Sequence, residues 1–414
     1  MVDGEVPEVP GAKFKFKFQR THTHTHTHTH TLLDRCTEAH KLTLSKKMMQ
    51  LRQQLSQNAL EDCPVWQNQR LEIAGEAFSD GDIDLIAEAV SKYKVIRTLK
   101  VAMCRVTEDQ RRNLMGIIKH GDLSSAQFAY LGINEKTAPS IAAAMQESLH
   151  LKRLELPFNE LGPQGAVWIA NGLRDSGVTE LLLMKNNLGA SGIAPICEVI
   201  STGQTSIRYL DFSRNDIGEE GAFRVAAMLE KVPDQIRNLE LDNNQILPLG
   251  IEAICSSVGP RLEYLSISGN FLTSQASIQA LVEMLKSSSL EKLGLNLLGI
   301  DDDVLLQIAE GVKSAHHLKH LKLNDNFKIT DRGMYEFLKE IGYPVALERM
   351  DLHQSGITSI CEKFVKEYLK VLQSESAKLM TVLVSSRVIP RIGQATLLRL
   401  LPVELIRSVG ACLA

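Results

Sequence analysis

The sequence predicts a curved α/β solenoid, a horseshoe of about 10–11 stacked repeats with parallel strands on the concave side and helices on the convex side. Three observations predict it. A pattern of apolar residues, one asparagine and one glycine occurs three times in succession: Leu154, Leu156, Asn159, Leu161 and Gly165, then Leu181, Leu183, Asn186, Leu188 and Gly192, then Leu210, Phe212, Asn215, Ile217 and Gly221. Each copy ends in apolar residues at helical spacing, such as Ile169, Ala170 and Leu173. The period is also nearly constant over most of the chain.

One framework position, at the centre of each expected strand, can be followed through residues 63–361. It is occupied by Leu71, Leu99, Ala126, Leu154, Leu181, Leu210, Leu239, Leu265, Leu293, Leu321 and Met350, at intervals of 26 to 29 residues. Four units lack the asparagine and have Glu76, Cys104, Leu131 or Leu298 at its position. A period this regular predicts units that contact only their neighbours in a line.

Each part of the unit has an expected physical role. The x-Leu-x-Leu segment forms a short strand whose leucines point inward, while the alternate residues face the concave side. The asparagine turns the chain out of the strand, and its side chain can bond backbone groups that the irregular turn leaves unpaired. Gly165, Gly192, Gly221 and Gly250 follow six residues later, where a side chain would crowd the neighbouring unit. Because a helix is wider than a strand, the stack must curve.

This pattern resembles the ribonuclease-inhibitor type of leucine-rich repeat, as in the unit Leu210-Asp-Phe-Ser-Arg-Asn215-Asp-Ile-Gly218-Glu-Glu-Gly221. The resemblance covers roughly 300 residues of the chain and implies the α/β horseshoe. Such units occur in ribonuclease inhibitors, Ran GTPase-activating proteins, tropomodulin-like actin binders and innate immune receptors. The fold therefore leaves the bound partner open, since function depends on the site that the fold carries.

The repeat region, residues 63–361, is flanked by segments of different composition. Residues 1–35 are expected to be a disordered low-complexity tail, with a His-Thr tract at residues 21–31 that either binds a metal ion loosely or has no function. Residues 36–62 are expected to form a helix that caps the first repeat, or one that binds a partner. Residues 362–414, which open with a helix from Glu362 to Leu372, are expected to be a helical cap or a partner-docking segment.

Composition and motifs exclude several classes of function. The chain is 44% apolar and 23% charged with a net charge of −3, which argues against a nucleic-acid partner. No apolar run approaches the ~18 residues that would span a membrane. Seven cysteines without paired spacing favour a reducing compartment, cytoplasmic or nuclear, and Cys197 and Cys255 fall in a small buried position of the convex helix. No catalytic, phosphate-binding or metal-binding motif is present, so we expect a monomer without enzymatic activity, cofactor or metal.

The candidate binding residues are those at alternate strand positions on the concave face. Early units offer an apolar and aromatic group, and central units offer acidic groups with one further aromatic residue: Phe158, Leu182, Met184 and Tyr209, then Asp211, Glu240, Asp242 and Tyr264. Later units carry both signs of charge: Lys292, Lys322, Asp325, Arg349 and Asp351. Apolar anchors surrounded by charge are typical of a protein interface. The alternative is a solvated inner face with no partner.

These features lead to three hypotheses about function. The first is a non-enzymatic scaffold that binds a protein partner on the concave face. The second is a regulator of a small GTPase, which the resemblance to Ran GTPase-activating proteins implies. The third is a substrate adaptor of a cullin ubiquitin ligase acting through residues 379–414, because Leu401-Pro-Val-Glu-Leu-Ile-Arg-Ser-Val409 resembles the start of an F-box and the order of segments resembles a suppressor-of-cytokine-signalling-type box.

Overall fold

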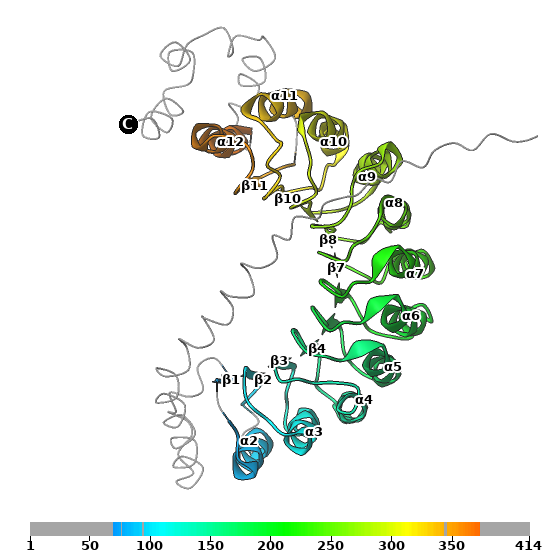
Figure 1. Cartoon of the computed structure of the whole chain (residues 1–414), viewed down its shortest axis with the longest axis vertical. Coiled ribbons are helices and arrows are strands. Elements are labelled where there is room, and N and C mark those ends of the chain that lie inside the picture. The colour runs from blue at the N-terminus through cyan, green and yellow to red at the C-terminus, as the bar shows by residue number, and fades with distance from the viewer. Residues whose placement is uncertain (1–68, 76, 93–94, 343–345, 373–414) are drawn as a thin grey trace, which may run out of the picture.

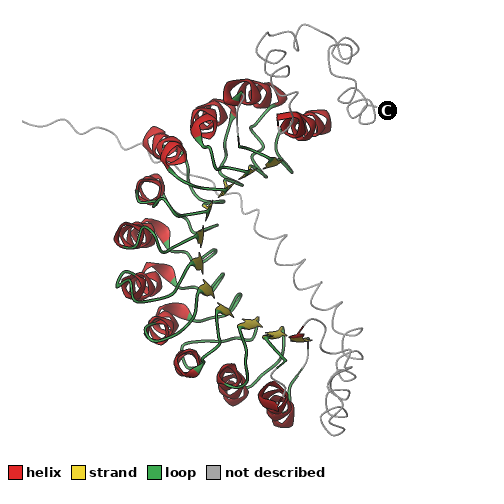
Figure 2. Ribbon diagram, turned by 180° about the vertical axis from the view of Figure 1, so that it is seen from behind, coloured by secondary structure: helices red, strands yellow, loops and turns green. Residues whose placement is uncertain are grey.

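The computed structural model describes residues 69–75, 77–92, 95–342 and 346–372, which form one arc of stacked units (Figure 1). Within these residues, eleven strands make one parallel sheet in the order β1 to β11, so that each strand pairs with its neighbours in the sequence. The strands lie on the inner side of the arc and the helices on its outer side (Figure 2). The prediction of an α/β horseshoe solenoid is confirmed.

The elements alternate along the chain. The strands are β1 (Arg70–Ala74), β2 (Thr98–Ala102), β3 (Ser125–Ala129), β4 (Arg153–Glu155), β5 (Glu180–Leu182), β6 (Tyr209–Asp211), β7 (Asn238–Glu240), β8 (Tyr264–Ser266), β9 (Lys292–Gly294), β10 (His320–Lys322) and β11 (Arg349–Asp351). The helices are α2 (Asp80–Lys92), α3 (Glu108–Gly116), the 3-10 helix η2 (Ile117–Lys119), α4 (Ala138–Glu147), α5 (Gly162–Leu173), α6 (Gly189–Ile200), α7 (Gly218–Lys231), α8 (Pro248–Ser256), α9 (Gln275–Ser287), α10 (Asp302–Ser314), α11 (Asp331–Ile341) and α12 (Ser359–Leu372).

The strand register follows the predicted framework position in each unit. Leu71 pairs with Leu99, which pairs with Ala126, and the series continues without a slip to Leu321 and Met350. These side chains are all at most 4% exposed and belong to one continuous core between sheet and helices. A slip of one residue would turn the leucines outward, so burial of this face selects the register.

A buried asparagine amide joins each central unit to the unit before it. The Oδ1 atom of Asn215 accepts the backbone N–H of Asn186 at 2.8 Å, and its amide nitrogen donates to the carbonyl oxygens of Leu183 and Phe212, both at 2.9 Å. The same position both accepts and donates such bonds in four other units, at Asn159, Asn244, Asn270 and Asn326. Asn186 donates to the carbonyl oxygen of Leu156, but its Oδ1 atom is buried without a partner among the described residues. The predicted role of the asparagine in satisfying the turn is therefore confirmed.

The series of asparagines is interrupted at Leu298, and a second polar series crosses this part of the inner face. The backbone N–H of Asn296 donates to the Ser268 hydroxyl at 3.1 Å, and that of Asn324 donates to Asn296 Oδ1 at 2.9 Å. The N–H of His353 then donates to Asn324 Oδ1 at 2.8 Å. Side chains on the concave side thus bond the backbone across three unit boundaries, two of which adjoin the unit that contains Leu298.

Glycines at the start of the convex helices allow neighbouring units to approach closely. A Cβ atom at Gly250 would lie 2.8 Å from the Cβ of Ala222 in the preceding helix, and one at Gly192 would lie 3.1 Å from the Cα of Pro163. At Gly221 the first clash would be with Ile217 of the same unit, at 2.7 Å. A side chain at these glycines would therefore be crowded, as predicted. The crowding comes from the preceding turn of the same unit as well as from the neighbouring unit.

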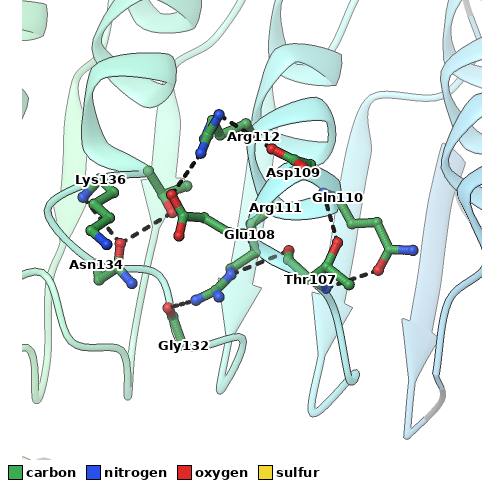
Figure 3. Close-up of polar contacts among 10 residues, drawn as sticks. Thr107, Glu108, Asp109, Gln110, Arg111, Arg112, Gly132, Asn134 and Lys136 are labelled. Atoms are coloured by element: carbon green, nitrogen blue, oxygen red, sulfur yellow. Dashed lines mark hydrogen bonds and ion pairs between the residues drawn. The ribbon is translucent and has the colours of Figure 1, made fainter.

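Helix α3 connects the early units, which lack the asparagine (Figure 3). The Thr107 hydroxyl accepts the N–H of Gln110, and the Gln110 side chain accepts the N–H of Thr107, so the first turn is capped. Gln110 also donates to the carbonyl oxygen of Phe78 in the preceding unit at 3.0 Å. Arg111 donates to the carbonyl oxygen of Gly132 in the following unit. One helix therefore bonds to a unit on either side.

Several sequence predictions lie outside the described residues. They are the tail at 1–35 with its His-Thr tract, the helix at 36–62, and residues 373–414, which contain the segment 379–414 of the adaptor hypothesis. Helix α12 begins at Ser359, three residues before the predicted Glu362, because the Thr358 hydroxyl accepts the N–H of Cys361 and caps the first turn. Among the described residues, no helix has the length and apolar character to span a membrane, and no group of His, Cys, Asp and Glu has the arrangement of a metal site.

Replacing Asn215 with alanine is expected to open the boundary between the β5 and β6 units. The substitution leaves the N–H groups of Asn186 and Leu188 without their buried acceptor, which costs roughly 3 kcal/mol. The carbonyl oxygens of Leu183 and Phe212 each keep one amide donor, from Asn186 and Asn244. Because units unfold locally, the amides of Asn186 and Leu188 should exchange with deuterium roughly 100-fold faster. The control is Asn171→Ala, at an exposed position of α5. Exchange within twofold of the wild-type rate would contradict this role.

Candidate partner-binding surface

The concave face consists of the residues that flank each buried leucine. In β4, for example, Leu154 is buried while Arg153 and Glu155 lie on the inner surface, where Arg153 bonds Glu155 and also Glu180 of β5. Parallel pairing places equivalent residues of neighbouring units side by side. The inner face is therefore a set of rows, and the chemistry of each row can change from one unit to the next.

One further row lies at the end of the strands and is formed by residues with positive φ. It comprises the residue just before the asparagine position in each unit: Gly75, Met103, Tyr130, Phe158, Lys185, Arg214, Asn243, Gly269, Leu297, Asp325 and Gln354. Most of these are not glycine, so the turn imposes a left-handed backbone that costs about 1 kcal/mol or more at each position. Phe158 belongs to this row and not to the alternate strand positions from which it was predicted.

An apolar groove occupies the concave face from β2 to β6. Its volume is about 320 Å³, and its lining comprises Lys100, Ala102, Met103, Gln127, Ala129, Tyr130, Glu155, Pro157, Phe158, Leu182, Met184 and Asp211. The rings of Tyr130 and Phe158 are stacked, with centroids 4.3 Å apart and planes 11° from parallel. Tyr130 is 45% exposed and Met103 is 49% exposed, so the groove presents large apolar groups to solvent. Leu182 and Asp211, at 9% and 8%, are buried in its floor.

The strand alternation missed Tyr130 and Met103, although the sequence contains a signal for both. Each stands directly before the residue that replaces the asparagine, Leu131 after Tyr130 and Cys104 after Met103. Phe158 stands in the same place before Asn159. An alignment of all units on that position would therefore have put the three side chains in one row, next to the candidates Leu182 and Met184.

The predicted acidic residues form a group next to the groove. Asp211 accepts the N–H of Ser213 at 2.9 Å, Asp242 accepts the N–H of Ser268 at 3.0 Å, and Glu240 accepts the phenol hydroxyl of Tyr209. None of the three carboxylates forms an ion pair with a described residue. Burial raises the pKa of Asp211 to about 6, and the neighbouring carboxylates of Glu240 and Asp242 add to the rise, against the bonds from Ser213. Burial also raises the pKa of Asp242.

The remaining candidates divide between two places. Tyr209, Glu240, Tyr264 and Lys322 line a second hollow of about 420 Å³, together with Asn238, Glu263, Glu291 and Lys292. Arg349 lies apart from these, in a third hollow between β11 and α12, where its guanidinium bonds Asp351 at 2.8 Å. His320, which the candidate set did not include, bonds the same carboxylate at 2.8 Å. The predicted set thus separates into an apolar group, an acidic group and a basic group along the arc.

Replacing Asp211 with asparagine is expected to remove part of the pH dependence of stability. Because its folded-state pKa is about 6, well above the ordinary value of 3.8, the folded chain keeps a proton that the unfolded chain has already lost at intermediate pH. This carboxyl therefore lowers the free energy of unfolding as pH rises from about 4 to 6, by on the order of 3 kcal/mol. The amide that replaces the carboxyl retains an oxygen acceptor for the Ser213 N–H.

The measurement is the midpoint of thermal unfolding of wild type and Asp211→Asn across this pH range. The difference between the two proteins should grow in favour of the variant as pH rises. Asp234→Asn, at an exposed carboxylate, is the control and should follow wild type. Parallel profiles for wild type and Asp211→Asn would show that the carboxyl does not titrate in this range.

Comparison with known proteins finds one family model and several relatives. A family model for the leucine-rich repeat matches residues 203–226 and 314–338. The ribonuclease inhibitor of Sus scrofa is 24% identical over 249 residues, which are 58% of this chain and 54% of that protein. RAN GTPase-activating protein 2 of Arabidopsis thaliana is 29% identical over 128 residues, 30% of this chain and 23% of that protein. The crystal structure of the yeast Rad7–Elc1 complex has a TM-score of 0.49 at 16% identity, covering 67% of this chain and 68% of that one.

The repeat family model and the ribonuclease inhibitor agree with the repeating units described above. The matched part of the chain spans about half the length of the ribonuclease inhibitor. The buried asparagine, the framework leucines and the outer helices recur at the spacing of that repeat type. The chain is a leucine-rich-repeat protein of the ribonuclease-inhibitor type.

Proposed function

We propose that this chain is a monomeric, non-enzymatic scaffold that binds one protein partner along its concave face. The observation that carries the proposal is the stacked pair of Tyr130, which is 45% exposed, and Phe158, which is partly buried. Both rings line the apolar groove. Aromatic residues that are exposed in a preformed groove lose little side-chain entropy on binding, because stacking already holds them. They are therefore suited to anchor a partner's apolar side chain.

The surroundings of the groove support the same role. Lys185 lies over the Phe158 ring at 5.6 Å, and the acidic group of Asp211, Glu240 and Asp242 begins at the groove floor. Burial of an apolar side chain supplies affinity, whereas charges around it select the partner and its orientation. None of the sequence motifs expected of a catalytic site accompanies these residues. The conclusion is a binding surface whose strongest contacts lie between β2 and β6.

The match to RAN GTPase-activating protein 2 supports a second candidate, a regulator of a small GTPase. Such a regulator would accelerate GTP hydrolysis when the full chain is added to Ran. The measurement is the rate of phosphate release by Ran with and without this chain. An unchanged rate would exclude a role as an activator of GTP hydrolysis by Ran and would leave the scaffold as the proposed function.

The scaffold is tested by replacing Tyr130 and Phe158 with asparagine in the full-length chain. Asparagine tolerates the positive φ of both positions, so the backbone is preserved while the aromatic surface is lost. The double variant should capture its copurifying partner roughly tenfold more weakly or worse, as expected for loss of a central anchor. Trp168→Ala is the matched control, because it removes an aromatic residue that is 44% exposed on the outer helix α5.

A second pair of variants, Tyr209→Ala and Asp211→Ala, tests the neighbouring acidic group in the same assay. Capture that is equal for wild type, the double variant and Trp168→Ala would contradict the groove as the anchor. Capture that is reduced only by Trp168→Ala would place the partner on the convex side instead.

A further inference from the structure

Two lysine ammonium groups from neighbouring units converge on one tyrosine ring in the second hollow. Tyr264 is the first residue of β8 and pairs with Lys292 of β9. The Nζ atom of Lys292 lies 4.4 Å from the centre of the Tyr264 ring, and that of Lys322 in β10 lies 5.3 Å from it. Lys322 also donates to the phenol oxygen of Tyr264 at 3.3 Å. Both ammonium groups are therefore oriented before any partner binds.

A glycine lies in the row between Lys322 and the unit of Tyr264. Gly294 pairs with Ser266 on one side and with Lys322 on the other, so it occupies the row that Lys322 must cross to reach Tyr264. A Cβ atom at Gly294 would lie only 2.1 Å from the Ser266 hydroxyl oxygen. A side chain there would displace Ser266, and Gly294 itself presents no side chain between Lys322 and β8.

The two lysines differ from the other cations around the hollow in having no carboxylate partner. Arg237 pairs with Glu263 at 3.1 Å, and Lys319 pairs with Glu291 at 3.1 Å. Neither Lys292 nor Lys322 forms an ion pair with any residue in the described part of the chain. Burial and the charge of Lys322 together lower the pKa of Lys292, as expected for like charges held close together. The pair thus lies on the inner face without an ion pair to a described residue, although the carboxylates of Glu240 and Asp351 act on Lys292 from a greater distance.

Carboxylates near the two lysines limit which anion the hollow can bind. Glu263 and Glu291 pair with Arg237 and Lys319, whereas Glu240 lines the hollow without an ion pair to a described residue. Asp242 interacts with Lys322 through space. A carboxylate, with a single charge, is repelled less by Glu240 and Asp242 than a phosphate dianion would be.

We propose that the hollow around Tyr264, Lys292 and Lys322 binds one carboxylate side chain of the protein partner. The inference rests on the proposed concave-face scaffold and specifies what the partner must present. The carboxylate accepts hydrogen bonds from both ammonium groups, which the tyrosine ring already holds in place. The apolar groove is centred on β4 and this site on β9, five strand spacings away, which is about 25 Å. The partner therefore carries an apolar side chain and an acidic one about that far apart.

The test uses the full chain with its lysines converted to ¹³C-dimethyl-lysine, which keeps the positive charge, and follows their NMR signals. Lys292→Arg and Lys322→Arg variants assign the two resonances. Titration with sodium acetate, against sodium chloride at equal ionic strength, should shift these two signals saturably and raise the pKa of Lys292 by roughly half a unit to one unit. The signals of Lys313 and Lys319, which already pair with Glu340 and Glu291, serve as internal controls.

Each outcome bears on the proposal. A saturable response of Lys292 and Lys322 to acetate supports it. Equal responses to acetate and chloride, or equal responses of all four lysines, would overturn it. Tighter binding of inorganic phosphate than of acetate would overturn the choice of a carboxylate. Because the chain is tested alone, failure here is separate from failure of the scaffold, which the Tyr130 and Phe158 variants measure.

Discussion

The structure depends on the burial of one amide side chain between successive units. A short parallel strand followed by an irregular turn leaves backbone groups that no strand or helix can bond. Asn215 and most of its equivalents supply a donor and an acceptor at that point, and each donates to the preceding unit. Leucines fill the core, but similar apolar residues can replace one another there. The amide has specific geometric requirements, which makes it the residue that sets the path of the chain from strand to helix.

The same turn determines which side chains the proposed binding surface can contain. It forces the residue before the asparagine into a left-handed conformation in unit after unit, and it does so whether that residue is Tyr130, Lys185 or Asp325. The strain belongs to the fold, so the side chain at this position is free to vary. Met103, Tyr130 and Phe158 occupy this position in three successive units. The result is an apolar row at the margin of a surface whose floor is otherwise built by the strands.

Along the arc the inner face is sorted by charge. An apolar groove comes first, the carboxylates of Asp211, Glu240 and Asp242 follow, and the ammonium groups of Lys292 and Lys322 come after them. Most other charged side chains on this face are paired, as in Arg153 with Glu180 and Arg349 with Asp351. Paired surface charges contribute little to stability or recognition. The unpaired groups are the ones that the proposed partner would have to neutralise.

The repeat period by itself determined the fold of this protein, including the register of the sheet. Leu71 through Met350 pair as the spacing predicts, because only one register buries every framework residue. The candidates Leu182, Met184, Asp211 and Tyr264 also lie on the inner face for this reason. Tertiary structure alone decided which residues meet. Tyr130 stacks on Phe158 because the turn rotates both out of the strand alternation. Lys322 reaches Tyr264, 58 residues earlier, across a row in which Gly294 has no side chain.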